Sequence, residues 1–130
     1  MKVVIIGGVA SGMSAATRLR RLKEDASITV YEMAEHVSYA NCGLPYFVSD
    51  VIAQRDSLLL QTPESLWARF RLDVKVRHKV VNIDRAAKVV SVENLATGEI
   101  FKDSYDKLVI TTGAKPKRLD LPGMERALEL

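Results

Sequence analysis

Val3-Val4-Ile5-Ile6-Gly7-Gly8-Val9-Ala10-Ser11-Gly12 is the stretch that decides the fold of this chain. Its β-branched run predicts a buried strand over 3–6, and the small and apolar residues that follow predict a helix over 10–22. A second apolar run over 28–31 predicts another buried strand, which ends at Glu32. A strand, a helix and a second strand form a βαβ unit, so we expect an α/β fold with a parallel, helix-covered sheet.

The turn after the first predicted strand has the context of a dinucleotide-binding motif. Gly7 permits a tight turn, and small residues let backbone N–H groups at the helix N-terminus approach a pyrophosphate. Glu32 follows Gly12 by about 20 residues, the spacing at which a carboxylate accepts hydrogen bonds from ribose hydroxyls. Val9 stands where the motif has its middle glycine. The alternative is a tight turn that binds no ligand. The predicted nucleotide-binding residues are Gly7, Gly8, Val9, Ala10, Ser11, Gly12 and Glu32.

The rest of the chain predicts a doubly wound, Rossmann-like α/β domain with a small antiparallel insertion. A Thr62 cap followed by proline predicts a helix that runs to about Phe70, and alternation predicts a strand over 73–77. Three short β-rich pieces between about 79 and 104 are separated by turns, which predicts an antiparallel meander inserted into the parallel sheet. A last buried strand is expected over 108–110.

The last predicted strand opens into Thr111, Thr112 and Gly113. In open α/β sheets, ligands lie beyond the carboxyl ends of the strands. Gly113 permits close backbone approach, and the threonine hydroxyls are suited to the linker of a flavin nucleotide. The alternative is a plain exit from strand to loop. The order of glycine turn, meander and Thr-Gly exit resembles the flavoprotein disulfide reductases, which favours FAD.

Composition limits the other functions. The 130 residues are 48% hydrophobic and 27% charged, a balance typical of a globular domain, and the net charge is +3. The charges are interspersed, so we expect neither nucleic-acid nor membrane binding. The first apolar run is too short for a signal sequence or a membrane span. His36 and His78 have no partners at metal-ligand spacing, so we expect ordinary surface or loop histidines and no metal site.

Cys42 is the only cysteine of the chain, so it cannot form an internal disulfide, which fits a reducing compartment such as the cytoplasm. A thiol near the N-terminus of a short helix is stabilised as thiolate by free N–H groups and the helix dipole, and Pro45 suits such a first turn. Gly43 would leave room for a flat isoalloxazine ring, and Asn41 would orient the sulfur. The alternative is a small buried hydrophobe.

The whole chain resembles the N-terminal FAD-binding segment of the coenzyme A disulfide reductases, including those fused to a rhodanese domain that act on persulfides. The stretches that carry the resemblance are Ile5–Gly12, Ser38–Tyr46, Leu60–Glu64 and Tyr105–Leu108. It implies a cytoplasmic homodimeric enzyme that uses FAD and either NADH or NADPH. Its nicotinamide-binding and dimerisation domains would lie outside these 130 residues, and the substrate would be coenzyme A disulfide or persulfide.

The resemblance also implies site residues, with Cys42 as the redox nucleophile. Further FAD contacts would come from Met33, Asn41, Cys42, Val81, Thr111, Thr112 and Gly113. Substrate contacts would come from Ser14, Arg18, Arg21, Ser38 and Asn41. The first three of these share one helix face because they recur at i, i+4 and i+7, and a basic stripe suits the phosphates of coenzyme A. The alternative is a solvated helix face. A basic family contact falls on Phe70 here, where Arg69 and Arg71 flank it.

Related enzymes remain as alternatives. Superfamily members with two redox cysteines would need a second cysteine at position 47, where this chain has phenylalanine. NADH oxidases and peroxidases also use one cysteine, as a sulfenic acid, but their glycine turn has a histidine where this chain has Ala10. That difference favours disulfide or persulfide reduction. A nicotinamide-dependent dehydrogenase domain leaves the Cys42 stretch unexplained, and a non-catalytic nucleotide-binding or interaction module would lack a reactive thiol.

Overall fold

The first of two sheets is parallel and builds the centre of the molecule. The computed structural model describes residues 1–115 and 120–126. Ile5, at the middle of the sheet, pairs with Val30 on one side and Val109 on the other. Every pair in this sheet is parallel, so the carboxyl ends of the strands meet at one edge. The strand order is β3-β2-β1-β7, with bounds β1 Lys2–Ile6, β2 Ser27–Tyr31, β3 Asp73–Lys75 and β7 Lys107–Ile110.

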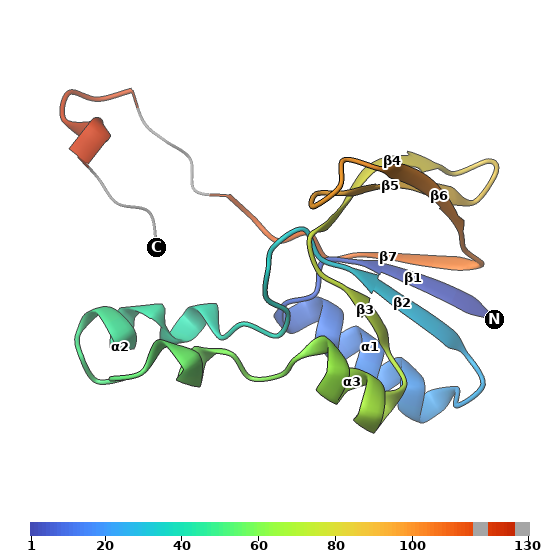
Figure 1. Cartoon of the computed structure of the whole chain (residues 1–130), viewed down its shortest axis with the longest axis horizontal. Helices are drawn as coiled ribbons and strands as arrows, with labels where there is room; N and C mark the ends of the chain where they lie inside the picture. Colours follow the sequence, from blue (N-terminus) through green and yellow to red (C-terminus); the bar gives the residue numbers. More distant parts are fainter. Residues whose placement is uncertain (116–119, 127–130) are drawn as a thin grey trace.

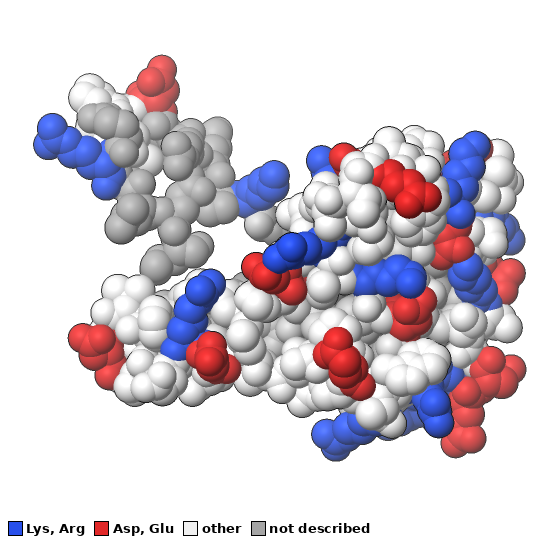
Figure 2. Space-filling model, viewed as in Figure 1, with Lys and Arg blue, Asp and Glu red and all other residues white. Residues whose placement is uncertain are grey.

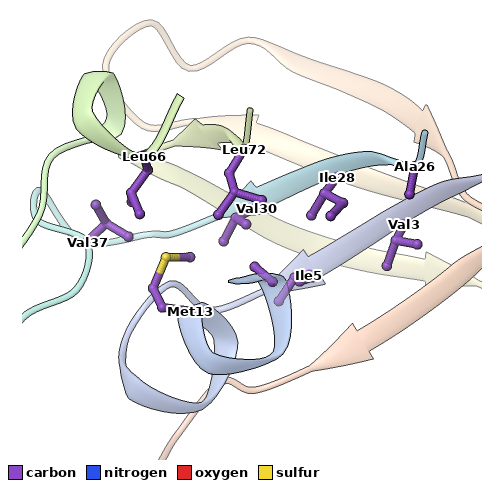
Figure 3. Close-up of a cluster of buried hydrophobic side chains, with 10 residues drawn as sticks. Val3, Ile5, Met13, Ala26, Ile28, Val30, Val37, Leu66 and Leu72 are labelled. Carbon is purple, nitrogen blue, oxygen red and sulfur yellow. The ribbon is translucent and has the colours of Figure 1, made fainter. Parts of the chain in front are cut away.

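Two helices, α1 (Ala10–Leu22) and α3 (Pro63–Phe70), cover one face of this sheet (Figure 1). Thr62 and Ser65 form a capping box that satisfies backbone N–H groups at the start of α3. Figure 3 shows the core between the layers, where strand and helix side chains point toward one another. Its buried members are Val3, Ile5, Met13, Ala16, Ala26, Ile28, Val30, Val37, Leu66 and Leu72.

The second sheet is antiparallel, has the order β4-β5-β6 and covers the opposite face (Figure 1). Its strands are β4 (His78–Asp84), β5 (Val89–Asn94) and β6 (Ile100–Ser104). Val4 and Tyr31 of the parallel sheet pack with Val90 and Val92 in a second buried cluster. The predicted fold class is confirmed, with the antiparallel sheet in the layer opposite the helices.

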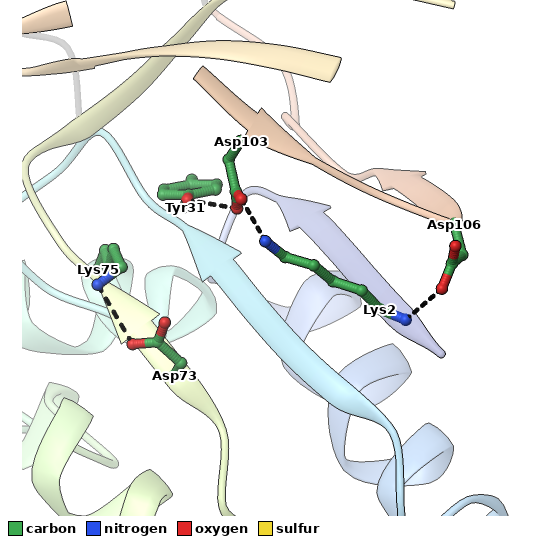
Figure 4. A network of polar contacts seen from close by, with 6 residues as sticks. All are labelled: Lys2, Tyr31, Asp73, Lys75, Asp103 and Asp106. Carbon is green, nitrogen blue, oxygen red and sulfur yellow. Dashed lines mark hydrogen bonds and ion pairs between the residues drawn. The ribbon is translucent and has the colours of Figure 1, made fainter. Parts of the chain in front are cut away.

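A network of polar contacts connects the two sheets (Figure 4). The Tyr31 hydroxyl donates a hydrogen bond of 2.8 Å to Asp103 on β6, and the Lys2 ammonium group pairs with the same carboxylate. The backbone N–H of Lys2 donates to Asp106 over 2.6 Å. Burial raises the pKa of Tyr31 far above its usual range, and the Asp103 carboxylate raises it further. The two sheets are therefore joined by polar bonds as well as by apolar packing.

An arm of short helices connects β2 to α3 and extends away from the sheet (Figure 1). It contains a 3-10 turn over Asn41–Gly43, α2 (Leu44–Val48) and a second 3-10 turn over Arg55–Leu58. A further 3-10 turn, outside the arm, lies at Met124–Arg126 after β7. Basic and acidic side chains are interspersed over the face seen in Figure 2. None of the helices in the described part of the chain is long and apolar enough to cross a membrane.

Candidate functional site

A cavity of about 130 Å³ lies where β1 and β2 end, the edge at which open α/β sheets bind ligands. The antiparallel sheet closes it from the other side through the start of β4. Four residues predicted to bind the nucleotide meet here: Gly7, Glu32, Met33 and Thr112. The remaining lining residues are Ile6, Tyr31, His78, Lys79 and Val80.

Glu32 has a structural role that its spacing in the sequence does not reveal. Its side chain is buried, with one carboxylate oxygen accepting from the Gly8 N–H over 2.7 Å and the other from the Ala34 N–H over 2.8 Å. Each carboxylate oxygen can accept two hydrogen bonds, so both retain capacity toward the cavity. The carboxylate therefore organises the glycine turn, and its bond to a ribose stays a prediction.

Close packing around the glycine turn explains two of its glycines. Gly7 has a φ of +99°, and a Cβ there would lie 2.3 Å from the Thr111 carbonyl oxygen. A Cβ at Gly12 would lie 1.9 Å from the Gly7 oxygen. The Thr111 hydroxyl lies 2.8 Å from the carbonyl oxygen of Ile6 and 3.0 Å from that of Gly7. The hydroxyl predicted to bind a flavin linker is thus already bonded to the turn.

The remaining turn residues leave free backbone N–H groups at the N-terminus of α1. The Gly7 N–H donates to the Tyr31 carbonyl over 2.8 Å, so neither it nor the Gly8 N–H is available to a ligand. The first bond of the helix runs from Met13 N–H to Val9 oxygen over 3.0 Å, and the N–H groups of 10–12 have no acceptor within the helix. Val9 has a φ of −93°, outside the left-handed region that favours glycine.

His78 is a site residue that sequence reasoning missed, and the expectation of an ordinary surface or loop histidine is wrong. It lies on β4, half-buried, and lines the cavity. Its ring packs at 6.0 Å from Phe101 and 6.3 Å from Tyr31, measured between centroids. Its Nδ1 lies 2.7 Å from the carbonyl oxygen of Val76, which can only accept, so Nδ1 carries the proton. In the neutral ring, Nε2 is left as an acceptor.

Val81, a predicted FAD contact, does not line the cavity with its side chain. The register of β4 with β5 passes from the Val80–Val92 pair to the Asn82–Ser91 pair. Val81 is therefore the extra residue of a β-bulge and has no partner on β5. A bulge beside a cavity leaves a backbone N–H and carbonyl free to meet a ligand.

A second hollow, a groove of about 320 Å³, lies between α1 and α3. It unites two predicted substrate contacts, Ser14 and Ser38, and is also lined by Ala10, Met13, Thr17, Gln61, Leu66, Arg69 and Phe70. Arg18 and Arg21 are exposed further along α1 and do not line it. Asn41 is exposed on the arm and also lies outside the lining. The groove thus brings together part of the predicted substrate set.

Cys42 is exposed, in the 3-10 turn that precedes α2. The segment that carries it follows β2 and is attached to the glycine turn, because the Ser38 N–H donates to the Gly8 carbonyl over 2.8 Å. Gly43 is buried, and a Cβ there would lie 2.6 Å from Leu58 Cδ2. The expectation that Gly43 leaves room for a ring is wrong, since a leucine of the same arm fills that space. Gly113 has a φ of +71° and open space around it.

Comparison with known proteins gives the family of this chain. Residues 1–130 match the family described as pyridine nucleotide-disulphide oxidoreductase. A coenzyme A disulfide reductase from Staphylococcus aureus (strain bovine RF122 / ET3-1) is 39% identical over 118 residues, which are 91% of this chain and 27% of that protein. The chain therefore spans only about a quarter of that relative's length.

Two solved structures share the fold at high similarity. Reduced Bacillus anthracis CoADR-RHD has a TM-score of 0.91 at 45% identity, covering 98% of this chain and 23% of the other. A NAD-dependent persulfide reductase from A. fulgidus has a TM-score of 0.91 at 39% identity, covering 96% of this chain and 23% of the other. The resemblance stated from the sequence motifs is confirmed. This chain belongs to the pyridine nucleotide-disulphide oxidoreductase family.

Proposed function

We propose that this chain is the FAD-binding part of an NAD(P)H-dependent enzyme that reduces coenzyme A disulfide or coenzyme A persulfide through Cys42. Membership of the family implies the use of a flavin and a pyridine nucleotide. One observation carries the proposal further. The exposed Cys42 lies on a segment that is hydrogen-bonded, through Ser38, to the glycine turn. The complete enzyme would be a cytoplasmic homodimer with separate nicotinamide-binding and dimerisation domains.

The residues present fit a dinucleotide such as FAD. The N–H groups of 10–12 at the start of a 13-residue helix favour a pyrophosphate. Glu32 in the cavity retains acceptor capacity for ribose hydroxyls, and Val81 offers unpaired backbone groups beside the cavity. Met33 and Thr112 line the same cavity. We assign Gly113, Asn41 and Cys42 to the side of the site where the redox chemistry occurs.

The proposed chemistry uses Cys42 as nucleophile. Its thiolate attacks one sulfur of coenzyme A disulfide, so the substrate S–S bond breaks, a mixed disulfide forms, and one coenzyme A leaves as a thiolate. A bound flavin supplies the two electrons that NAD(P)H donates. Reduction of the mixed disulfide releases the second coenzyme A and restores the Cys42 thiolate. With one proton taken up from water, NAD(P)H and the disulfide yield NAD(P)⁺ and two thiols; a persulfide yields one coenzyme A thiol and hydrogen sulfide.

Flavin binding is tested on the 130-residue chain itself. The chain is incubated with FAD, desalted, and its absorbance measured between the near-UV and the blue. We expect retained flavin, and weaker retention in Glu32→Gln, which replaces one of the two acceptor oxygens with a donor. A protein that stays colourless but binds NADH tightly would contradict the flavin assignment and favour a dehydrogenase domain.

The redox role of Cys42 is tested in the enzyme that contains this chain together with its partner domains. Cys42→Ser should retain flavin and lose turnover of coenzyme A disulfide and persulfide, because a hydroxyl cannot form the mixed disulfide. Unchanged turnover would refute the role. NADH consumption that depends on oxygen or peroxide, with no effect of either sulfur substrate, would instead identify an oxidase or peroxidase.

A further inference from the structure

We propose that the His78 ring is a second acceptor for the adenosine ribose of FAD. Its Nε2 accepts a hydrogen bond from one ribose hydroxyl, while the Glu32 carboxylate accepts from the other. This role deepens the proposed function and rests on it, because the ligand is taken to be FAD. The dinucleotide motif places an acidic residue alone at the ribose. His78 has no position in that motif, and the sequence predicts an ordinary surface or loop histidine there.

The Nε2 atom of His78 is an acceptor that the fold leaves unused. The ring's other nitrogen, Nδ1, lies 2.7 Å from the Val76 carbonyl oxygen and carries the proton, so Nε2 of the neutral ring has a lone pair and no hydrogen. Nε2 has no hydrogen-bond partner in the described ranges 1–115 and 120–126. In those ranges every buried side-chain nitrogen or oxygen has a partner. Nε2 is therefore not sealed inside the fold, and a ligand in the cavity can reach it.

The position of the His78 ring is held from three directions. Its centroid lies 6.3 Å from that of Tyr31 and 6.0 Å from that of Phe101. Tyr31 is itself held by the bond from its hydroxyl to Asp103 (Figure 4). The bond from Nδ1 to Val76 fixes the third side. Because the ring is already ordered, a ligand that bonds to Nε2 does not bear the entropic cost of immobilising it.

Backbone contacts bring His78 beside Glu32. The His78 N–H donates to the Glu32 carbonyl over 2.9 Å, and the Glu32 N–H donates to the Lys75 carbonyl over 2.9 Å. The start of β4 is thus attached to the end of β2, and both side chains line the cavity of about 130 Å³. Each carboxylate oxygen of Glu32 already accepts one backbone N–H and keeps one lone pair. A ribose diol carries two O–H donors, and these two neighbouring acceptors match them.

The test changes the ligand and the protein together. Binding of ADP, 2′-deoxy-ADP and 3′-deoxy-ADP to the full chain is measured by titration calorimetry. We expect His78→Phe, which keeps an aromatic ring without an acceptor, to weaken ADP binding about three- to tenfold, the loss typical of one neutral hydrogen bond. The same substitution should change the binding of one deoxy nucleotide less than about 1.5-fold, because that nucleotide lacks the hydroxyl in question. His78→Gln keeps an acceptor oxygen and should recover part of the loss.

His36 provides a matched control. It is half-buried, as His78 is, and lines a different hollow, with Val37, Leu59 and Pro63 among its neighbours. His36→Phe makes the same chemical change away from the cavity. We expect it to alter ADP binding less than about twofold.

The set of nucleotides keeps the outcomes distinct. Equal weakening of all three by His78→Phe would overturn the ribose contact, while the proposed function would stand. Inosine diphosphate lacks the adenine amino group; if it alone bound equally to the wild type and to His78→Phe, Nε2 would face the base and the ribose contact would be overturned. A wild type that retains FAD on desalting but does not bind ADP would also overturn the ribose contact alone. A wild type that binds neither would overturn it together with the proposed cofactor.

Discussion

Replacing Arg20 with leucine should loosen the junction between the ends of α1 and α3. The Arg20 guanidinium bonds the carbonyl of Phe70 at 2.8 Å and that of Arg71 at 2.9 Å, both at the C-terminus of α3. It also bonds the carbonyls of Glu24 at 2.6 Å and Ala26 at 2.7 Å in the loop after α1. One side chain therefore satisfies carbonyls from two separate segments, which no shorter or neutral residue can do.

The size of the effect follows from these four bonds. At about 1 kcal/mol net for each bond, their loss would cost about 4 kcal/mol. Water can reach some of the freed carbonyls, because Arg20 is only half-buried. Leucine also keeps most of the apolar stem. We therefore expect the free energy of unfolding to fall by about 3 kcal/mol, a large share of what a domain of this size possesses.

Urea unfolding followed by far-UV circular dichroism measures this change. Arg21→Leu is the control, because Arg21 is exposed on the same helix and makes a single bond of 3.4 Å to the Thr17 carbonyl. We expect it to cost less than about 0.5 kcal/mol. A loss in Arg20→Leu no larger than that of the control would refute the assignment of Arg20 as the tie between the two helices.

Three further changes test other contacts. Gly12→Ala should destabilise the chain by about 3 kcal/mol or more in the same urea assay, since its Cβ would lie 1.9 Å from the Gly7 oxygen; Ser11→Ala, at an exposed position, should be neutral. Tyr31→Phe should reduce the loss of stability at alkaline pH: the folded chain holds the Tyr31 proton above its usual pKa, so above about pH 10 the wild type should lose about 1.4 kcal/mol more per pH unit than the variant. Equal slopes would contradict the raised pKa. Gly43→Ala should lower the free energy of unfolding by about 1 to 3 kcal/mol, because Leu58 occupies the space that the added Cβ needs. An unchanged urea midpoint would contradict this, since it would show that the arm accommodates the Cβ without loss of stability.

The fold could be predicted because its signals are local. The β-branched run before Gly7 gave a strand, the small residues after it gave a helix over 10–22, and Thr62 gave the start of α3; the structure has each of these elements. The meander was equally local, since turns separate its strands. Apolar periodicity and turn chemistry act within a few residues and are readable from one sequence.

The site could be predicted only in part, because several contacts depend on which distant segments meet. His78 lines the cavity because β4 crosses the carboxyl end of β2, and no spacing in the sequence indicates that crossing. Gly43 packs against Leu58, which belongs to the second 3-10 turn of the arm and lies well beyond Gly43 in the sequence. Arg20 and Arg21 are neighbours of the same type, yet Arg20 makes four bonds of 2.9 Å or shorter to carbonyls, whereas Arg21 is exposed and makes one bond of 3.4 Å. Such differences arise from tertiary contacts.

The glycine turn shows why a motif alone is weak evidence for a ligand. Gly7 is explained by the approach of the Thr111 carbonyl, Gly12 by that of the Gly7 carbonyl, and Glu32 by its bonds to backbone N–H groups. Packing would therefore favour all three in a protein that bound nothing. The polar groups that the packing leaves without a partner are more informative about a ligand. The N–H groups of 10–12 have no acceptor within the helix, and Glu32 keeps free lone pairs and lines the cavity. The bond from the Ser38 N–H to the Gly8 carbonyl attaches the segment that bears Cys42 to the same turn. The free N–H groups at the start of α1 and the segment that bears Cys42 are thus both attached to one turn, which supports the proposal that the thiol acts beside a bound nucleotide.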